Sequence, residues 1–515
     1  MTVSRDDSWD EEHDVVVVGS GAGALTGAYL AARDGHDTVV LEKAGRLGGT
    51  SAYSGAACWL PGSEVQQRAG SADSSQSARD YLTAVLGGSE PEKVEAFVAT
   101  APGLVAELEK DPALEFRLQP FPDYFDAAGR VPMGRSIVPL EIEQADLGEL
   151  LALVRPPVER DREGLGHAEG AQLVGGRALI GRLLLAFDRT GSGEVRTGHA
   201  VTELVTDGER VVGVVAQTLD GPRRIGARRG VLLGSGGFER NQEMRSAHGV
   251  PGAADWAMAP AGTNTGEPIE AAVAVGAATE LMDQGWWCPG IAHPDGSAAF
   301  TLGFRGGVVV DATGNRFANE SLPYDRMGRE MFAEPGHVPA WFVFDARSGG
   351  DLPAISLPPR SPAEHLESGT WVQAPTLEEL AGATGLPADA LTATVQRFNG
   401  FAEQGRDEDF GRGDDEFDRF FAIGTGPNPA LVPLDQPPYV AARLVLSDLG
   451  TKGGLRTDTS ARVLREDGTV IAGLYAAGNA SASMAGAFYP GPGIPIGTAM
   501  VFSALAVRDM LDASL

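Results

Sequence analysis

Apolar and polar positions near the N-terminus fall into blocks that predict a β-strand, a helix and a second β-strand. Valines fill positions 15–18, an alanine-rich stretch runs from Gly23 to Asp34, and a second apolar run covers Thr38 to Leu41. Short apolar runs joined through a glycine-rich turn and a helix are typical of a βαβ unit, which has two parallel strands. The N-terminal segment therefore indicates an α/β fold.

Later blocks extend the same domain. Strands are expected at 195–204 and 211–217, and an apolar run after them ends at a Gly-Ser-Gly-Gly turn, residues 234–237. The chain closes with the sequence GLYAAGN at 473–479 and an apolar helix expected from Gly497 to Met510. These segments predict the remaining strands and the last helix of the first domain.

The composition changes between residues 282 and 449, which contain paired tryptophans, scattered prolines and a helical segment expected at 376–403. We predict a discontinuous FAD-binding domain, residues 1–281 and 450–515, with a catalytic domain, residues 282–449, inserted into it. The acidic stretch 407–418 (DEDFGRGDDEFD) does not have the ligand spacing of an EF-hand. We expect it to be a solvated loop and not a calcium site.

Length and charge narrow the classes of function. A chain of 515 residues is long enough for two structural units, and a net charge of −29 without a basic run argues against nucleic acid and anionic membranes as partners. Its only cysteines, Cys58 and Cys288, are far apart, so neither a disulfide framework nor a cysteine metal cluster is expected. No bound metal is predicted.

The N-terminus is acidic and polar, unlike a signal peptide, and no stretch of about 18 uninterrupted apolar residues follows. We expect a cytoplasmic protein without an integral membrane segment. Peripheral contact with a membrane is left open.

A glycine-rich turn between the first strand and helix indicates a dinucleotide cofactor. Residues 19–24 read G-S-G-A-G-A, in which Gly19 allows the tight turn, Gly21 lets the backbone approach a pyrophosphate, and Ala24 packs the helix on the strand. The phosphates would lie at the positive end of the helix. Twenty-three residues after Gly19, Glu42 is placed to accept hydrogen bonds from ribose hydroxyls. The other expected contacts in this region are Ser20, Ala22, Gly23 and Lys43.

A second glycine-rich segment, residues 43–55, suits a cofactor longer than NAD. Together with the turn at 234–237 and GLYAAGN at 473–479, it resembles the FAD-binding pattern of the succinate dehydrogenase and fumarate reductase flavoprotein superfamily. The resemblance implies a Rossmann-like FAD-binding domain of the glutathione-reductase type with an inserted α+β catalytic domain. The further cofactor contacts it implies are Gly48, Gly49, Thr50, Ser51, Ser54, Gly55, Ser235, Gly236, Gly237, Gly478, Asn479, Pro495 and Ile496.

Two features that the sequence lacks bear on how FAD is attached and how it is reoxidised. Residues 48–57 contain no histidine, so non-covalent FAD is expected. The sequence has no second strand-turn-helix dinucleotide fingerprint, so electrons are expected to leave to an external acceptor.

Three tyrosines lie in distinctive contexts: Tyr124 in PDYF (122–125), Tyr324 in NESLPYDR (319–326) and Tyr489 in FYPGPG (488–493). With GTSAYSG at 49–55 and SDLGTKGGLRTD at 447–458, they resemble the bacterial 3-ketosteroid Δ1-dehydrogenases, over 14–509. The resemblance implies removal of two hydrogens from ring A of a 3-oxosteroid, which forms a C1–C2 double bond.

The resemblance also implies residue roles. The Tyr489 hydroxyl and the backbone N–H of Gly493 would hold the C3 carbonyl oxygen as enolate charge grows. The neighbouring Pro492 and Pro495 have no N–H to donate, whereas Gly493 keeps its own. Tyr324 would remove the C2 proton with Tyr124 as its hydrogen-bonding neighbour, while hydride leaves C1 for flavin N5. Trp286, Trp287 and Phe121 fit a steroid wall and ordinary core packing equally well.

Three alternatives remain. A 3-ketosteroid Δ4-(5α)-dehydrogenase would act on the same ring at C4 and C5. A fumarate reductase would need arginine and histidine clamps, but Arg305 and Arg326 lack that motif context. A noncatalytic flavin-binding electron carrier would leave the tyrosines without a task.

Overall fold

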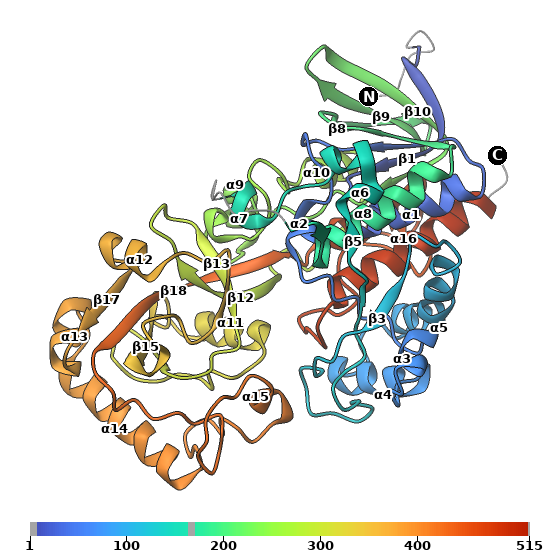
Figure 1. Ribbon diagram of the computed structural model, residues 1–515. Coiled ribbons are helices and arrows are strands. Elements are labelled where there is room, and N and C mark those ends of the chain that lie inside the picture. The colour runs from blue at the N-terminus through green and yellow to red at the C-terminus, as the bar shows by residue number, and fades with distance from the viewer. Residues whose placement is uncertain (1–7, 163–169, 513–515) are drawn as a thin grey trace. The chain divides into compact units, whose positions relative to one another are not determined.

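The structure is a computed structural model that describes residues 8–162 and 170–512 (Figure 1). The chain divides into two units. Unit 1 comprises Met1–Gly249, Ala259–Gln284 and Gly450–Leu515, and unit 2 comprises Val250–Met258 and Gly285–Leu449. Residues 250–258 thus group with the second unit, whereas the sequence analysis placed them in the first domain.

Unit 1 is built around a parallel sheet. Its parallel strands follow the order β21 (Val470–Ala476), β10 (Gly221–Leu233), β1 (Glu11–Val18), β2 (Thr38–Leu41) and β7 (Gly193–Arg196). Antiparallel β20 (Arg462–Leu464) lies at one edge, and the hairpin of β8 (Ala200–Asp207) and β9 (Arg210–Thr218) pairs with the start of β10. The predicted N-terminal βαβ unit is confirmed, with α1 (Ala22–Arg33) as its helix.

The strand expected at 195–204 is wrong. It is two strands, β7 and β8, because the turn between them contains Gly198 with φ +68°. A left-handed backbone here ends one strand before the next begins.

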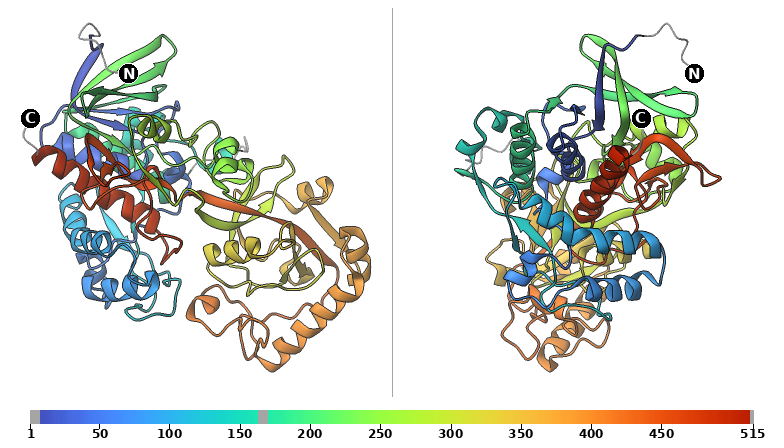
Figure 2. Two further views of the ribbon diagram at one scale, coloured as in Figure 1. Left: turned by 180° about the vertical axis from the view of Figure 1, so that it is seen from behind. Right: turned by 90° about the vertical axis from the view of Figure 1, so that its right-hand side faces the viewer.

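Helices cover the sheet of unit 1. α1 packs against α8 (Gly175–Arg189) and α16 (Ile494–Asp512), and α16 also packs against α5 (Pro91–Leu108), as the views in Figure 2 show. α16 begins at Ile494 and not at Gly497, because Pro495 needs no N–H partner in a first turn. By length and hydropathy α16 alone among the described helices would qualify as a membrane span, a test that buried core helices also pass.

Shorter elements complete unit 1. The helices are α2 (Gly49–Tyr53), α3 (Glu64–Arg68), α4 (Ser75–Leu86), α6 (Gln144–Leu147), α7 (Val158–Asp161), α9 (Gln242–His248) and α10 (Glu267–Ala274). Small two-stranded sheets pair β3 (Phe116–Leu118) with β4 (Ile137–Pro139), β5 (Ile142–Glu143) with β6 (Gln172–Leu173), and β11 (Thr279–Glu280) with β19 (Gly454–Leu455).

Unit 2 has a sheet of its own. The strand order is β14 (Val308–Val310), β15 (Ala340–Asp345), β18 (Tyr439–Thr451), β12 (Gly285–Ala292), β13 (Ala298–Leu302) and β16 (Ile355–Leu357), and β17 (Trp371–Ala374) also pairs with β18. Its helices are α11 (Tyr324–Ala333), α12 (Pro362–Ser368), α13 (Leu377–Thr384), α14 (Ala388–Gln404) and α15 (Glu416–Phe420). The single helix expected at 376–403 is wrong: Gly385, with φ +78°, and Pro387 divide it into α13 and α14.

The acidic stretch 407–418 is solvated at Glu408, Asp409, Asp414 and Glu416, as predicted, but its first and last carboxylates are buried. Asp407 and Asp418 are each only 3% exposed. Asp407 accepts a hydrogen bond from Arg316 (2.9 Å), and Asp418 accepts one from Asn319 (2.9 Å). Because buried carboxylates require such partners, these two residues are structural and fasten the segment that leads into α11.

The contact of α1 with α16 depends on a glycine. A β-carbon on Gly23 would lie 2.8 Å from the backbone oxygen of Ala499, whereas one on Gly103, in α5, would meet no atom within 4 Å. We predict that Gly23→Ala lowers the free energy of unfolding by about 1–3 kcal/mol, because the two helices must separate. The matched Gly103→Ala change should raise it by up to about 1 kcal/mol through helix propensity. Thermal unfolding of both variants checks the opposite signs.

Candidate functional site

The turn between β1 and α1 lies tightly against the end of β10. Gly19 has φ +95°, and a β-carbon there would lie 2.5 Å from the carbonyl oxygen of Gly234. Ala24 occupies the space that a β-carbon of Gly234 would need, 2.8 Å away. The amides of the first turn of α1 have no intrahelical acceptors, so this turn can bind an anion.

Glu42 is a buried acid at the end of β2. Its carboxylate accepts hydrogen bonds from Ser20 Oγ (2.5 Å) and from the Ala44 amide (2.8 Å). Burial raises the pKa of Glu42, and the bonds from Ser20 and Ala44 oppose that rise. Each carboxylate oxygen can accept a second hydrogen bond, which suits a ribose hydroxyl.

The side chain of Lys43, the residue after Glu42, contacts α10 and the residues before it. Its ammonium donates to Thr265 Oγ1 (2.6 Å) and pairs with Glu267 (2.7 Å) at the start of α10. The side chain of this expected cofactor residue is therefore engaged by the protein itself.

The second glycine-rich segment contains a short helix, α2, after Gly48, whose φ is +112°. Ser51 Oγ accepts from the Ala22 amide (3.2 Å), and the Gly48 amide donates to Ser20 Oγ (2.9 Å). These two bonds tie α2 to the turn at the start of α1. Gly176 packs against α2 and was not among the predicted site residues: a β-carbon there would lie 1.9 Å from the Ser51 carbonyl oxygen. The signal in the sequence was the pair of consecutive glycines, Gly175 and Gly176.

Residues 234–237 lie at the end of β10, and Gly478 and Asn479 follow β21. Side chains pack closely on glycine backbone in both segments: a β-carbon on Gly237 would lie 2.0 Å from Thr451 Oγ1, and one on Gly450 would lie 2.3 Å from Asn479 Nδ2. The sequence analysis did not identify Glu239, a buried acid here that accepts a hydrogen bond from Asn264 (2.8 Å).

Two buried hydroxyls distinguish this region as a ligand site. Ser235 Oγ and Thr50 Oγ1 are both buried and have no hydrogen-bond partner within the described part of the chain. Buried polar atoms are almost always satisfied, so these two hydroxyls fit contacts to a bound molecule. Together with the anion-binding turn and Glu42, they fit the pyrophosphate and ribose of FAD.

Two of the expected catalytic tyrosines lie together in unit 1. The rings of Tyr124 and Tyr489 are 5.2 Å apart between centroids, and the residues are 1% and 3% exposed. The Tyr124 amide and the Tyr81 hydroxyl both donate to the carbonyl of Pro490, at 2.9 and 2.6 Å. These bonds join the Tyr124 segment to the FYPGPG loop.

Gly493, at the end of that loop, is held in a backbone conformation that favours glycine. Its φ is +88°, and a β-carbon would lie 2.2 Å from the Ala57 carbonyl oxygen. The Trp59 amide donates to the Gly493 carbonyl (3.1 Å). Pro495 and Ile496 lie in the first turn of α16, immediately after it.

A buried ion-pair network supports Tyr124, and the sequence analysis did not identify it. Asp123 accepts from Trp59 Nε1 (2.8 Å) and Arg135 Nε (3.0 Å), and Arg135 also pairs with Asp73 (2.8 Å). The side chains of the three charged residues are fully buried. Burial raises the pKa of Asp123, and the charge of Arg135 opposes that rise. In the sequence, the network could have been suspected only from the position of Asp123 next to Tyr124.

Tyr324 lies in unit 2 as the first residue of α11, after the N-cap Pro323. Its ring is 7% exposed and packs edge-to-face on Phe300, with centroids 5.0 Å apart. The positive end of the helix dipole favours negative charge at this position.

Buried charges hold the segment before Tyr324. Glu320 accepts from the Val309 amide (3.1 Å) and pairs with Arg316 (2.8 Å) and Arg412 (3.1 Å). Each of these ion pairs joins side chains with at most 4% exposure. The segment that leads to Tyr324 and α11 is therefore anchored inside unit 2.

The three aromatic residues considered as steroid wall candidates have packing partners. Trp287 lies against Gly328 of α11, whose β-carbon would be 2.7 Å from that of Trp287, and its ring is 5.1 Å from that of Phe332. Trp286 is also buried. Phe121 packs edge-to-face on Tyr124, with ring centroids 6.3 Å apart.

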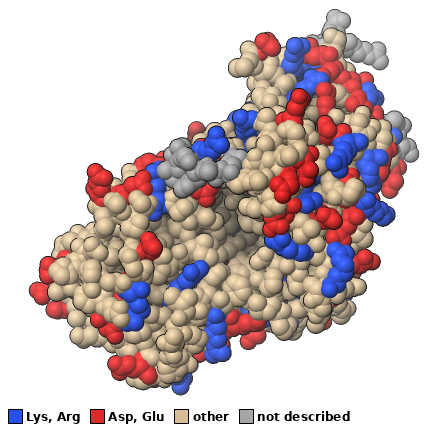
Figure 3. All heavy atoms as spheres, in the orientation of Figure 1, with Lys and Arg blue, Asp and Glu red and all other residues tan. Residues whose placement is uncertain are grey.

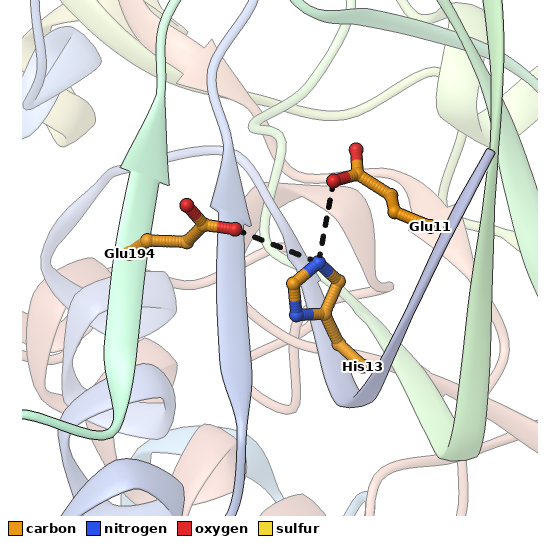
Figure 4. Close-up of side chains that lie close together, drawn as sticks. All are labelled: Glu11, His13 and Glu194. Carbon is orange, nitrogen blue, oxygen red and sulfur yellow. Dashed lines mark ion pairs between the residues drawn. The ribbon is translucent and has the colours of Figure 1, made fainter.

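One cluster outside these sites has the composition of a metal site. In the described part of the chain, Glu11, His13 and Glu194 bring their ligand atoms within 4.8 Å of one another (Figure 4). However, Arg196 lies 2.6 Å from both Glu11 and Glu194 and already supplies a cation to each carboxylate. We interpret the cluster as an ion-pair network between β1 and β7.

The surface carries both signs of charge. On the face drawn in Figure 3, aspartate and glutamate side chains are interspersed with lysine and arginine side chains. This mixed face does not have the concentrated basic character of a phosphate-backbone binding surface.

Comparison with known proteins gives consistent matches. Residues 14–496 match the family described as FAD binding domain. The chain is 44% identical to a 3-oxosteroid 1-dehydrogenase of Rhodococcus opacus (98% of this chain, 99% of the relative) and 41% identical to one of Mycobacterium tuberculosis (98% and 99%). The structure of a 3-ketosteroid delta1-dehydrogenase of Sterolibacterium denitrificans, in complex with 1,4-androstadiene-3,17-dione, matches with a TM-score of 0.89 at 33% identity (97% of this chain, 99% of that chain).

The Arg135 network makes a testable prediction. Arg135→Met leaves Asp73 and Asp123 buried without their cation, so we expect a loss of about 3–5 kcal/mol in the free energy of unfolding. Arg68→Met, which removes an exposed pair with Glu109, should cost at most about 1 kcal/mol.

The effect of pH separates this cause from simple loss of packing. Without Arg135, the pKa values of both carboxyls rise further, and a raised pKa favours the folded state at low pH. The penalty of Arg135→Met should therefore be smaller at pH 5 than at pH 8. Thermal unfolding at both pH values measures it, and an equal penalty would contradict the electrostatic explanation.

Proposed function

This chain belongs to the 3-oxosteroid 1-dehydrogenases of the FAD binding domain family, and we propose that it introduces a C1–C2 double bond into ring A of a 3-oxosteroid. The observation that carries the proposal is the buried ring pair of Tyr124 and Tyr489, with Tyr489 on the loop that leads through Gly493 to the start of α16. A noncatalytic flavin carrier would have no need of this arrangement.

We assign FAD to unit 1. Its phosphates would be held by the turn Gly19–Ala24 and its ribose by Glu42, with Ser235 and Thr50 as further polar contacts. The remaining contacts expected from the sequence come from α2, the end of β21 and the first turn of α16. When bound, FAD supplies the hydride acceptor that the reaction requires.

The Tyr489 hydroxyl and the Gly493 amide are assigned to the substrate's C3 carbonyl oxygen. Negative charge grows on this oxygen as the C2 proton leaves, and donors already in place stabilise it without reorganisation. The bonds to Pro490 and the fixed backbone of Gly493 supply that rigidity.

Tyr324 is assigned as the base that takes the C2 proton. An unperturbed tyrosine, with a pKa of about 10, is a poor base at neutral pH, so its ionised form must be stabilised. The N-terminal position on α11 supplies part of that stabilisation. Tyr124 is assigned as the neighbour that hydrogen-bonds to the base.

The proposed reaction also needs an external electron acceptor, since the sequence shows no second dinucleotide fingerprint. We propose residues 1–281 and 450–515 as the FAD-binding domain and 282–449 as the catalytic domain. A cytoplasmic location, with or without peripheral membrane contact, is part of the same proposal.

Product analysis tests the proposed reaction. We expect the purified protein to reduce an artificial dye when it is given androst-4-ene-3,17-dione, and to form the 1,4-diene. NMR of the product separates this outcome from a double bond at C4–C5, which would indicate the Δ4-(5α) alternative. No dye reduction by flavin-loaded protein would refute the proposal.

Substitution of Tyr324 tests the assigned base. Tyr324→Phe removes only the hydroxyl, so we expect turnover to fall by about 10²–10⁴-fold while flavin absorbance and steroid binding remain. The matched control in unit 2 is Tyr439→Phe, whose ring lies on β18 at partial exposure and which should keep wild-type turnover. Wild-type turnover in Tyr324→Phe would exclude Tyr324 as the base.

A further inference from the structure

Lys452 is a buried cation that the proposed mechanism leaves without a task. Only four of the 41 lysine and arginine residues are lysines, and Lys452 has 0% exposure. It follows β18, in the TKGG segment, where its amide donates to Gln284 O (2.9 Å) and its carbonyl accepts from the Ser483 amide (3.1 Å). The backbone of this lysine is therefore fixed on both sides.

The ammonium of Lys452 reaches the segment just before Tyr489. Nζ donates to the carbonyls of Phe488 (2.7 Å) and Ala487 (3.2 Å), and it lies 6.0 Å from the centroid of the Tyr489 ring. Two consecutive carbonyls are thus held by one donor group at the start of the FYPGPG loop. This contact limits the positions that the Tyr489 hydroxyl can take.

We propose that Lys452 is a positioning residue for Tyr489: it fixes the loop through the two carbonyls and makes the Tyr489 hydroxyl a stronger donor to the developing enolate. The second part rests on the proposed function. The position of Nζ over the Tyr489 ring places its positive charge close to that phenol. In a buried, weakly screened site, that charge acts strongly on a nearby phenol.

Lysine suits this place better than arginine. Its compact ammonium has three donors that can converge on adjacent carbonyls, whereas a planar guanidinium directs its donors in a fixed fork. A lysine here, in a chain that otherwise uses arginine for nearly all its positive charge, is consistent with that geometric demand.

Steady-state kinetics of Lys452→Met tests the proposal. Met keeps the unbranched apolar stem but removes the charge and the donors. We expect kcat per bound flavin to fall about tenfold or more, with the steroid KM changed by less than about threefold. Lys93→Met is the matched control, because it removes another mostly buried lysine, on α5, and should leave kcat unchanged.

A double-mutant cycle with Tyr489→Phe separates positioning from a general structural role. If Lys452 acts through the Tyr489 hydroxyl, Lys452→Met should cost less than about twofold in the Tyr489→Phe background. An equal loss in both backgrounds, or wild-type kcat in Lys452→Met, would overturn the proposal.

Hydrogen exchange tests the loop contact independently of turnover. We expect amides in residues 485–494 of flavin-loaded Lys452→Met to exchange at least about tenfold faster than in the wild type and in Lys93→Met. Unchanged exchange would overturn the positioning role even if the wild type proved inactive on steroids. An inactive wild type with faster exchange in the variant would instead refute the proposed function and retain the loop contact.

Discussion

Buried arginine–carboxylate pairs are the interaction on which the tyrosine sites depend. In unit 1, Arg135 lies between Asp73 and Asp123, and Asp123 precedes Tyr124 in the chain. In unit 2, Arg412 pairs with Glu320, four residues before Tyr324. Removing one partner of such a pair leaves an uncompensated charge in the interior, so each pair tolerates little displacement. The backbone at Tyr124 and Tyr324 is held in place because each tyrosine lies within four residues of an anchored carboxylate.

The cofactor region depends on a different constraint, the close approach of neighbouring atoms to glycine backbone. Gly19, Gly176, Gly237 and Gly450 all lie where a β-carbon would overlap a neighbouring atom, at 2.5 Å or less. These contacts join the end of β1 to the end of β10, the start of α8 to α2, and residues 450 and 451 to the segments that follow β21 and β10. Glycine is required at each place because any side chain would separate these elements. The buried hydroxyls of Ser235 and Thr50 lie among these contacts.

Local patterns in the sequence were enough to predict the N-terminal βαβ unit and the last helix. Valine runs, a G-x-G-x-x-A turn and an alanine-rich stretch each favour one local structure, and they agree with one another. Local patterns also predicted one strand at 195–204 and one helix at 376–403, where the structure has two strands and two helices. The apolar residues on both sides favoured one continuous element, although a glycine or proline interrupts each segment. The burial of Asp407 and Asp418 at the two ends of the acidic stretch was not predicted, since a carboxylate buried by a distant partner looks no different in sequence from an exposed one.

The sequence by itself determined the local features from which the site is proposed: a glycine-rich turn between β1 and α1, an acid at the end of β2, and tyrosines in contexts that resemble those of a family of steroid dehydrogenases. These features are local, because each depends on residues within about ten positions of one another. Tertiary structure alone decided that the rings of Tyr124 and Tyr489 pack together, that Arg135 pairs with Asp123 beside Tyr124, and that Lys452 holds the loop before Tyr489. Those contacts join residues far apart in the chain, and only packing of the whole interior brings them within bonding distance.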